Sequence, residues 1–167
     1  MAARYFNMLN SRVGMIQLRN IPANSLCLAL RSDLLAGLVR ARKERVEAVV
    51  IFGEGKGFSA GADINEFPRR RHLQQPMLGD VVRAIDNSEV PVIAGIHGYC
   101  FGGALELALA CQYRLVDRTA KLAFPEVNIG LIPGAGGTQR LPRLVGSKLA
   151  LDMCVTATVS PVARSSI

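Results

Sequence analysis

The stretch Val46–Phe52 (VEAVVIF), followed by the glycine-rich segment Gly53–Asp63 (GEGKGFSAGAD), decides the fold class of this chain. Apolar and β-branched residues fill nearly every position of the first segment, which is typical of a strand covered on both faces in a parallel sheet. Pro91–Ile96 (PVIAGI) repeats the pattern, and Gly102–Ala110 (GGALELALA) places strong helix formers after two glycines. Buried strands that alternate with helices predict an α/β protein with largely parallel sheets.

Further elements on both sides of this stretch fit the same class. Ser32 is predicted to cap a helix because apolar residues follow it at helical spacing. The other expected elements are a half-buried strand at Arg12–Arg19, a helix at Leu78–Asn87, short strands at Tyr113–Val116 and Lys121–Phe124, and helices from Thr138 onward.

Composition bounds the class of protein. The 167 residues are 50% hydrophobic and only 20% charged, which excludes a disordered chain and predicts one domain. The most apolar stretch, Pro91–Cys111, contains His97, Glu106 and four glycines, so we expect no membrane span. The N-terminus lacks a secretory signal, and Arg164–Ile167 (RSSI) is not the S-K-L peroxisomal address.

The net charge of +7 favours anionic partners. Aromatic residues make up only 5%, tryptophan is absent, and the one dense basic cluster is Arg69–His72 (RRRH). A solvated surface explains this cluster better than a nucleic-acid interface, so we expect no nucleic-acid partner, and a phosphate-bearing ligand stays open. The four cysteines show no C-x-x-C spacing and no fourth zinc ligand at a suitable distance, which predicts free thiols and no metal.

Two nucleotide-binding motifs fail, whereas a hydrolase motif is present. Phe58 stands at the third glycine position of G-x-G-x-x-G, and Lys56 is followed by glycine rather than by Ser or Thr. Gly57–Gly61 (GFSAG) matches the nucleophile elbow G-x-S-x-G, with Ser59 as nucleophile. No histidine follows His97 to serve as the base. A serine hydrolase or thioesterase that uses Ser59 therefore remains the alternative enzyme class.

Two isolated glutamates are candidates for acid–base chemistry. A helix that starts at Gly102-Gly103 offers free N–H groups and a positive dipole end to an anion. Glu106 lies on the first turn of this apolar helix, where it either complements the dipole or faces a site. Glu126 is similarly isolated among apolar residues, and the two could form an acid–base pair.

Three ordered blocks resemble the enoyl-CoA hydratase/isomerase (crotonase) superfamily. They are Phe58–Ile64 (FSAGADI), Gly98–Leu107 (GYCFGGALEL), and Pro125–Val127 (PEV) with Gly130–Leu141 (GLIPGAGGTQRL). The whole pattern is most similar to the hydratase/isomerase part of peroxisomal-type bifunctional enzymes. This resemblance implies a crotonase-like spiral of repeated ββα units.

The resemblance also implies where the domain ends. Residues 1–155 would form the crotonase-like core, and the helical part that follows in other members would be missing. Residues 156–167 (TATVSPVARSSI) look unrelated to the family, and we expect them to be a disordered tail.

The activity implied by the resemblance is hydration of a trans-2-enoyl-CoA to a 3-hydroxyacyl-CoA in fatty acid β-oxidation, with Δ3–Δ2 isomerisation at the same site. The family's oxyanion hole is carried over to the backbone N–H groups of Ala60 and Gly103, and its catalytic pair to Glu106 and Glu126. No separate cofactor is implied, because coenzyme A is part of the substrate. The residues placed along the CoA moiety are Ala62, Asp63 and Ile64.

Partners and location follow from the family in the same way. Its members are often trimers, or monomers when fused in bifunctional enzymes. The resemblance favours the peroxisome, with the mitochondrion and the cytoplasm as alternatives. A non-enzymatic alternative is an inactive truncated fragment that only binds CoA or partner subunits.

Overall fold

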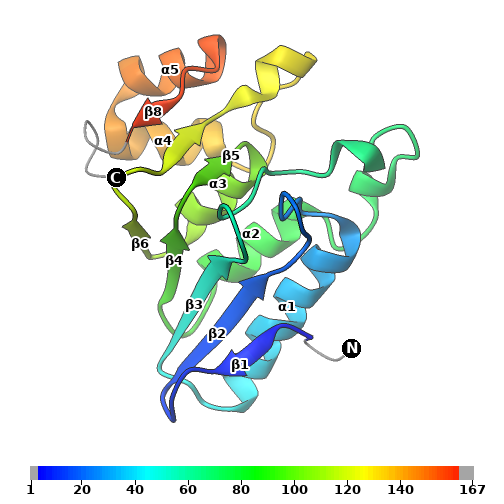
Figure 1. Cartoon of the computed structure of the whole chain (residues 1–167), viewed down its shortest axis with the longest axis vertical. Coiled ribbons are helices and arrows are strands. Elements are labelled where there is room, and N and C mark those ends of the chain that lie inside the picture. Colours follow the sequence, from blue (N-terminus) through cyan, green and yellow to red (C-terminus); the bar gives the residue numbers. More distant parts are fainter. Residues whose placement is uncertain (1–3, 162–167) are drawn as a thin grey trace.

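Two β-sheets form the frame of the chain in its computed structural model, which describes residues 4–161 (Figure 1). The larger sheet has the order β1-β2-β3-β4-β6 and the smaller one β5-β7-β8. Strands β2, β3, β4 and β6 run parallel, as predicted, and β1 pairs antiparallel with β2. The strands are β1 (Phe6–Met8), β2 (Val13–Leu18), β3 (Ala48–Gly53), β4 (Val92–Ile96), β5 (Tyr99–Phe101), β6 (Tyr113–Val116), β7 (Lys121–Ala123) and β8 (Ser160–Pro161).

Helices cover one face of the larger sheet and cap its upper end (Figure 1). They are α1 (Leu28–Lys43), α2 (Leu78–Asp86), α3 (Gly103–Ala110), α4 (Gly137–Val145) and α5 (Ser147–Thr156), with 3-10 turns η1 (Ile64–Glu66), η2 (Arg71–Leu73) and η3 (Pro125–Ile129). In β3, Val49 and Ile51 are fully buried, whereas Val50 and Phe52 are only half-buried. The expectation of a strand covered on both faces is therefore wrong, because helices pack on one side only.

The start of α1 differs from the prediction. Ser32 lies inside the helix, where its hydroxyl donates to the Leu28 carbonyl at 2.9 Å. The helix begins at Leu28, and its first N–H donates to Glu66 Oε1 at 2.7 Å. A carboxylate from η1 thus caps the helix through a tertiary contact, which a local capping pattern cannot reveal.

A spiral repeat links the two sheets. Each turn gives a strand to the larger sheet, then an extended segment beside the smaller sheet, and then a helix, as in β4–β5–α3 and β6–β7–η3. In the earlier turns the second segment shrinks to single bridges, which join Leu26 to Ala62 and Ser59 to Cys100. This repeat is the predicted succession of ββα units.

The predicted tail begins inside the fold. Thr156 is the last residue of α5, and Ser160–Pro161 pairs with β7 as strand β8. Its first residues are therefore continuous with the secondary structure, while residues 162–167 lie outside the described part of the chain.

Two further predictions concern membranes and metals. Between residues 4 and 161 no helix is both long and apolar enough to span a bilayer. The same residues contain no cluster of three or more His, Cys, Asp or Glu side chains suited to a metal ion.

All four cysteines are free thiols, and burial raises the pKa of Cys111 to about 12.

Candidate functional site

The site is built around the start of α3, where two glycines allow close approach. Gly102 has a φ of +53°, a backbone conformation that residues with a side chain rarely adopt. A Cβ at this position would also lie only 2.9 Å from Glu126 Oε1. A Cβ on Gly103 would meet Leu78 Cδ2 at 2.5 Å. The Gly103 N–H is the first of α3 and has no carbonyl within its own helix to bond. Glycine at both positions therefore brings a backbone donor next to a carboxylate.

Glu106 is held in a defined, buried position one turn into α3. Its side chain is almost inaccessible, and Oε1 accepts the N–H groups of Ala135 at 2.7 Å and Gly137 at 2.8 Å. Burial raises the pKa of Glu106, while these N–H donors and the positive charge of Arg140 act in the opposite direction. Glu106 is thus bound by the loop before α4 rather than by the start of its own helix.

Glu126 lies in a different environment at the start of η3. Its Oε2 is buried and makes no hydrogen bond within the described residues. Burial, and after it the negative charge of Glu106, raises the pKa of Glu126 to about 7. The charge of Glu106 thus acts on Glu126, and the two carboxylates differ within the described residues: backbone N–H groups bond Glu106 Oε1, whereas Glu126 Oε2 has no such partner.

Cys154 on α5 lies close enough to Glu106 and Glu126 for their charges to affect its thiol. Burial raises the pKa of its thiol, and the charges of Glu126 and Glu106 add to the increase. The helix also packs against η3, so it forms a wall beside the carboxylates.

Ala60 is not the backbone donor that was predicted. Its N–H donates to the Ala23 carbonyl at 2.9 Å and is therefore occupied. The N–H group two residues later makes no backbone hydrogen bond within the described residues. The Gly61 carbonyl accepts from Leu26 N at 2.8 Å, and in a trans peptide the next N–H, that of Ala62, points the opposite way.

The free Ala62 N–H lies beside the start of α3. A Cβ built on Gly103 would be 3.5 Å from the Ala62 nitrogen. Neither Ala62 nor Gly103 donates a backbone hydrogen bond to any residue between 4 and 161. The free N–H that lies beside Gly103 is therefore that of Ala62, two residues after the predicted Ala60.

Asp63 and Ile64 follow Ala62 at the rim. Asp63 Oδ1 accepts the backbone and side-chain N–H groups of Asn65, both at 3.0 Å, and so caps η1. The Ile64 side chain is 59% exposed. A pocket of about 430 Å³ adjoins this turn and is lined by Cys27, Leu28, Ala29, Asp63, Asn65, Glu66, Arg69 and Arg71.

Ser59 cannot serve as the nucleophile of a hydrolase. It is fully buried, its hydroxyl donates to the Asn24 carbonyl at 2.7 Å, and the same oxygen accepts from Gly61 N at 3.1 Å. His97 bonds instead to the Gly55 carbonyl, and the His72 ring lies against the Phe67 ring at a tilt of 53°. A serine without an exposed oxygen or an adjacent base is not activated for attack, so this alternative is wrong.

Ser59→Ala is accordingly expected to act on stability rather than on chemistry. Removal of the hydroxyl leaves the buried Asn24 carbonyl without that donor, which costs about 1–3 kcal/mol of unfolding free energy. The measurement is urea unfolding of both proteins beside turnover per folded molecule, which we expect to change less than threefold. Abolished turnover in a folded Ser59→Ala protein would restore the hydrolase.

Comparison with known proteins assigns the family. The Enoyl-CoA hydratase/isomerase family model matches residues 9–164. The chain belongs to this family. It is 46% identical over 149 residues to the peroxisomal bifunctional enzyme of Pongo abelii, covering 89% of this chain and 20% of that protein. A probable enoyl-CoA hydratase of Bacillus subtilis is 41% identical over 147 residues, covering 84% of this chain and 57% of that one.

Solved structures agree with this assignment. An enoyl-CoA hydratase from Bacillus anthracis superposes with a TM-score of 0.85 at 34% identity, over 95% of this chain and 64% of that chain. The two sheets and the ββα spiral are thus the crotonase fold. The chain spans about a fifth of the bifunctional relatives and rather more than half of the single-domain hydratases.

The sequence interpretation missed parts of this site. Ala135 and Gly137, which bind Glu106, lie in a glycine-rich segment that was quoted only as a family block. The missed Arg140 bonds the Ala135 carbonyl at 3.3 Å and pairs with Asp86 at the end of α2. The sequence signal that could have indicated Arg140 is its position on the first turn of the predicted helix, directly after the glycine-rich segment.

Proposed function

We propose that the chain catalyses the reversible hydration of a trans-2-enoyl-CoA to a 3-hydroxyacyl-CoA, as a step of fatty acid β-oxidation. The observation that carries this proposal is the pair of unequal carboxylates, Glu106 and Glu126, beside two free backbone donors at the start of α3. That combination fits addition of water across a double bond conjugated to a thioester carbonyl.

The backbone donors stabilise the charge that develops on the substrate. When hydroxide adds at C3, electrons move through C2 to the thioester oxygen, which becomes an enolate. The N–H groups of Ala62 and Gly103 are positioned to bind this oxygen, and the positive end of the α3 dipole adds to the field at Gly103. Side chains at 62 and 103 are small or absent, so the carbonyl can reach both donors.

The carboxylates divide the proton transfers. Glu106, whose charged form accepts two N–H bonds, takes a proton from water as the oxygen attacks C3. Glu126, with its raised pKa and free Oε2, delivers a proton to C2. The water supplies OH to C3, its remaining proton goes to Glu106, and exchange with solvent restores both groups.

Isomerisation uses the same groups without water. A carboxylate removes a proton from C2 of a 3-enoyl-CoA, the dienolate is held by Ala62 and Gly103, and a proton returned to C4 gives the 2-enoyl product. CoA lies along Ala62, Asp63 and Ile64, and no further cofactor is needed. The names of the bifunctional and glyoxysomal relatives favour a peroxisomal location.

The dependence of kcat on pH tests the roles of the two carboxylates. Because the acid must be protonated, kcat should fall as pH rises through the pKa of Glu126, about 7. At lower pH kcat should fall again as Glu106, whose pKa is raised by burial, takes up a proton. The check is initial rate against pH at saturating substrate. An alkaline limb that persists unchanged in Glu126→Gln would contradict the assignment of this group as the acid.

The decisive assay follows the loss of ultraviolet absorbance of the conjugated enoyl thioester, with short, medium and long acyl chains. Turnover that forms 3-hydroxyacyl-CoA supports the proposal. Binding of saturated acyl-CoA without turnover on any chain length would instead favour a CoA-binding role. Absence of both binding and turnover by a folded monomer would overturn the proposed function.

A further inference from the structure

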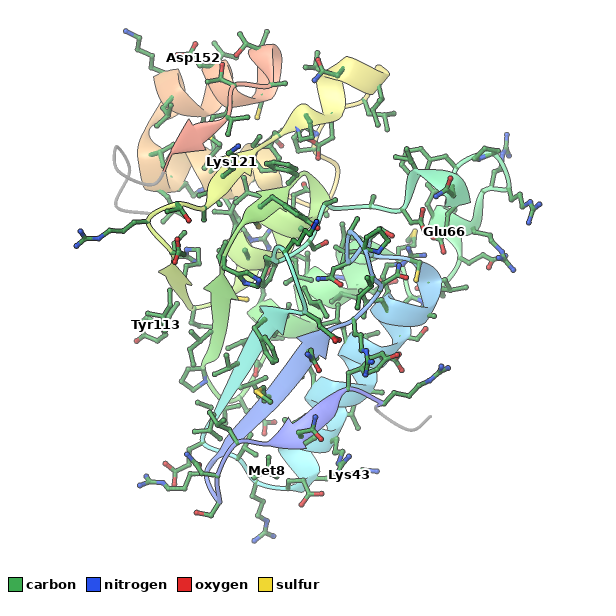
Figure 2. The ribbon with its side chains drawn as sticks, viewed as in Figure 1. Met8, Lys43, Glu66, Tyr113, Lys121 and Asp152 are labelled. Carbon is green, nitrogen blue, oxygen red and sulfur yellow. The ribbon has the colours of Figure 1, made fainter. Side chains whose placement is uncertain are left out.

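A buried ion pair lies outside the carboxylate site and takes no part in the chemistry proposed above. Arg31 on α1 contacts Glu66 on η1, with 2.8 Å between Nη1 and Oε2, and both side chains are nearly inaccessible. Figure 2 labels Glu66 beside the N-terminal end of α1. Removing two charges from water is costly, so a pair of this kind needs compensating hydrogen bonds.

Arg31 has such compensation from three backbone carbonyls. Nη1 also donates to Leu26 O at 2.7 Å, Nε donates to Pro76 O at 2.8 Å, and Nη2 donates to Arg71 O at 3.2 Å. One planar guanidinium thereby joins α1 to Leu26, two residues before the helix starts, and to two points in the segment that leads into α2.

Glu66 completes the connection on the other side. Its Oε1 caps α1 at Leu28 N while its Oε2 receives Arg31. Glu66 ends the short turn η1 that starts at Ile64, directly after the capping residue Asp63. Residues 63–76 are therefore joined to α1 at Glu66, Arg71 and Pro76 through the Arg31 side chain, and at Glu66 also through the Leu28 N–H.

We propose that Arg31, paired with Glu66, is the positioning residue that fixes segment 63–76 and thereby sets affinity for the CoA moiety. The inference rests on the proposed function, because Asp63 and Ile64 are assigned there to the CoA contact. The pocket beside this turn is lined both by α1, for example at Leu28, and by segment 63–76, for example at Arg69. Its shape therefore depends on the hydrogen bonds of Arg31 and Glu66 that hold these two parts together, here called the clamp. Nothing in the clamp touches Glu106 or Glu126.

Arg31→Lys is the informative substitution. Lysine keeps the positive charge, so Glu66 is not left unpaired, but its ammonium cannot reproduce the fork that bonds four oxygens. Loss of charge-assisted hydrogen bonds of this kind is expected to weaken binding about tenfold. Arg42→Lys is the matched control, because Arg42 lies on the same helix and pairs with Glu89 at 2.7 Å on the surface.

Calorimetric titration with hexanoyl-CoA, which cannot be hydrated, separates positioning from general damage. A misplaced binding segment raises the dissociation constant with unchanged stoichiometry, whereas partial unfolding lowers the stoichiometry of the remaining sites. We expect the first result for Arg31→Lys and neither for Arg42→Lys. Hydrogen exchange of the backbone amides of residues 64–75, prolines excepted, should quicken in parallel.

Three results would overturn the inference. An unchanged dissociation constant in Arg31→Lys does so, and so does a loss of stoichiometry alone. If Arg31→Lys does not fold, Glu66→Gln tests the same clamp, and unaltered hexanoyl-CoA affinity in that variant counts against it. Wild-type protein that neither binds nor turns over acyl-CoA refutes the proposed function itself, which is a distinct outcome.

Discussion

Glu106→Gln and Glu126→Gln are each expected to lower kcat about a thousandfold, because each removes one of the two proton transfers. The amide keeps the size of the side chain, so the substrate should still bind. Steady-state rates with a trans-2-enoyl-CoA, together with circular dichroism, measure both points. The double variant should lose little more than either single one, since groups that act as a unit are not additive.

Glu89→Gln is the control for these variants, because Glu89 is exposed and pairs with Arg42 far from the start of α3. It should retain full turnover. A folded Glu106→Gln or Glu126→Gln protein with more than a tenth of wild-type kcat would contradict the two-carboxylate mechanism.

Glu126→Gln should also change stability in a pH-dependent direction. The pKa of Glu126 in the folded protein, about 7, exceeds its value in an unfolded chain, so folding favours the protonated form. The contribution of Glu126 to the free energy of unfolding is therefore fully present below the pKa that the group has in the unfolded chain, and it is lost as pH rises through 7. Thermal melts at pH 8 should therefore show the variant more stable than wild type, with a smaller difference at pH 4.

The second large effect concerns association of the chain. Half of the exposed large hydrophobic residues, eight of sixteen in the described part, fall between residues 127 and 159. They lie on η3, the loop after it, α4, α5 and the residues that follow, and these helices pack against one another. An apolar surface of this extent favours contact with other molecules, so the isolated chain is expected to self-associate and to turn over poorly.

Size-exclusion chromatography with light scattering tests this expectation. The double variant Ile132→Ser, Leu151→Lys should shift the protein toward monomer, since these side chains are 76% and 62% exposed. Leu115→Lys, equally exposed on β6, is the control and should leave the distribution unchanged. A monodisperse wild-type monomer with a sharp, reversible melt would refute the prediction.

The order of the elements was readable from the sequence because their local signals were strong. The β-branched run after Val46 became β3, the glycine pair at 102 and 103 opened α3, and the predicted strands at Tyr113–Val116 and Lys121–Phe124 appeared with little change. The family blocks also predict Glu106 and Glu126 as the catalytic pair, which stays a prediction. The short strands β1 and β5 were not predicted, because a segment of three residues shows no measurable hydrophobic periodicity.

What the sequence by itself determined is the fold class and the family, because these depend on residue types at fixed spacing; the same spacing predicts Glu106 and Glu126 as the catalytic carboxylates. Tertiary structure alone decided which backbone N–H is free. Ala60 and Ala62 are the same residue type two positions apart, and only the Ala23 carbonyl and the Leu26 bridge distinguish the occupied donor from the open one. It also decided that Glu66 caps α1 and that Glu126 titrates near 7, since burial and long-range contacts come from segments distant in the chain.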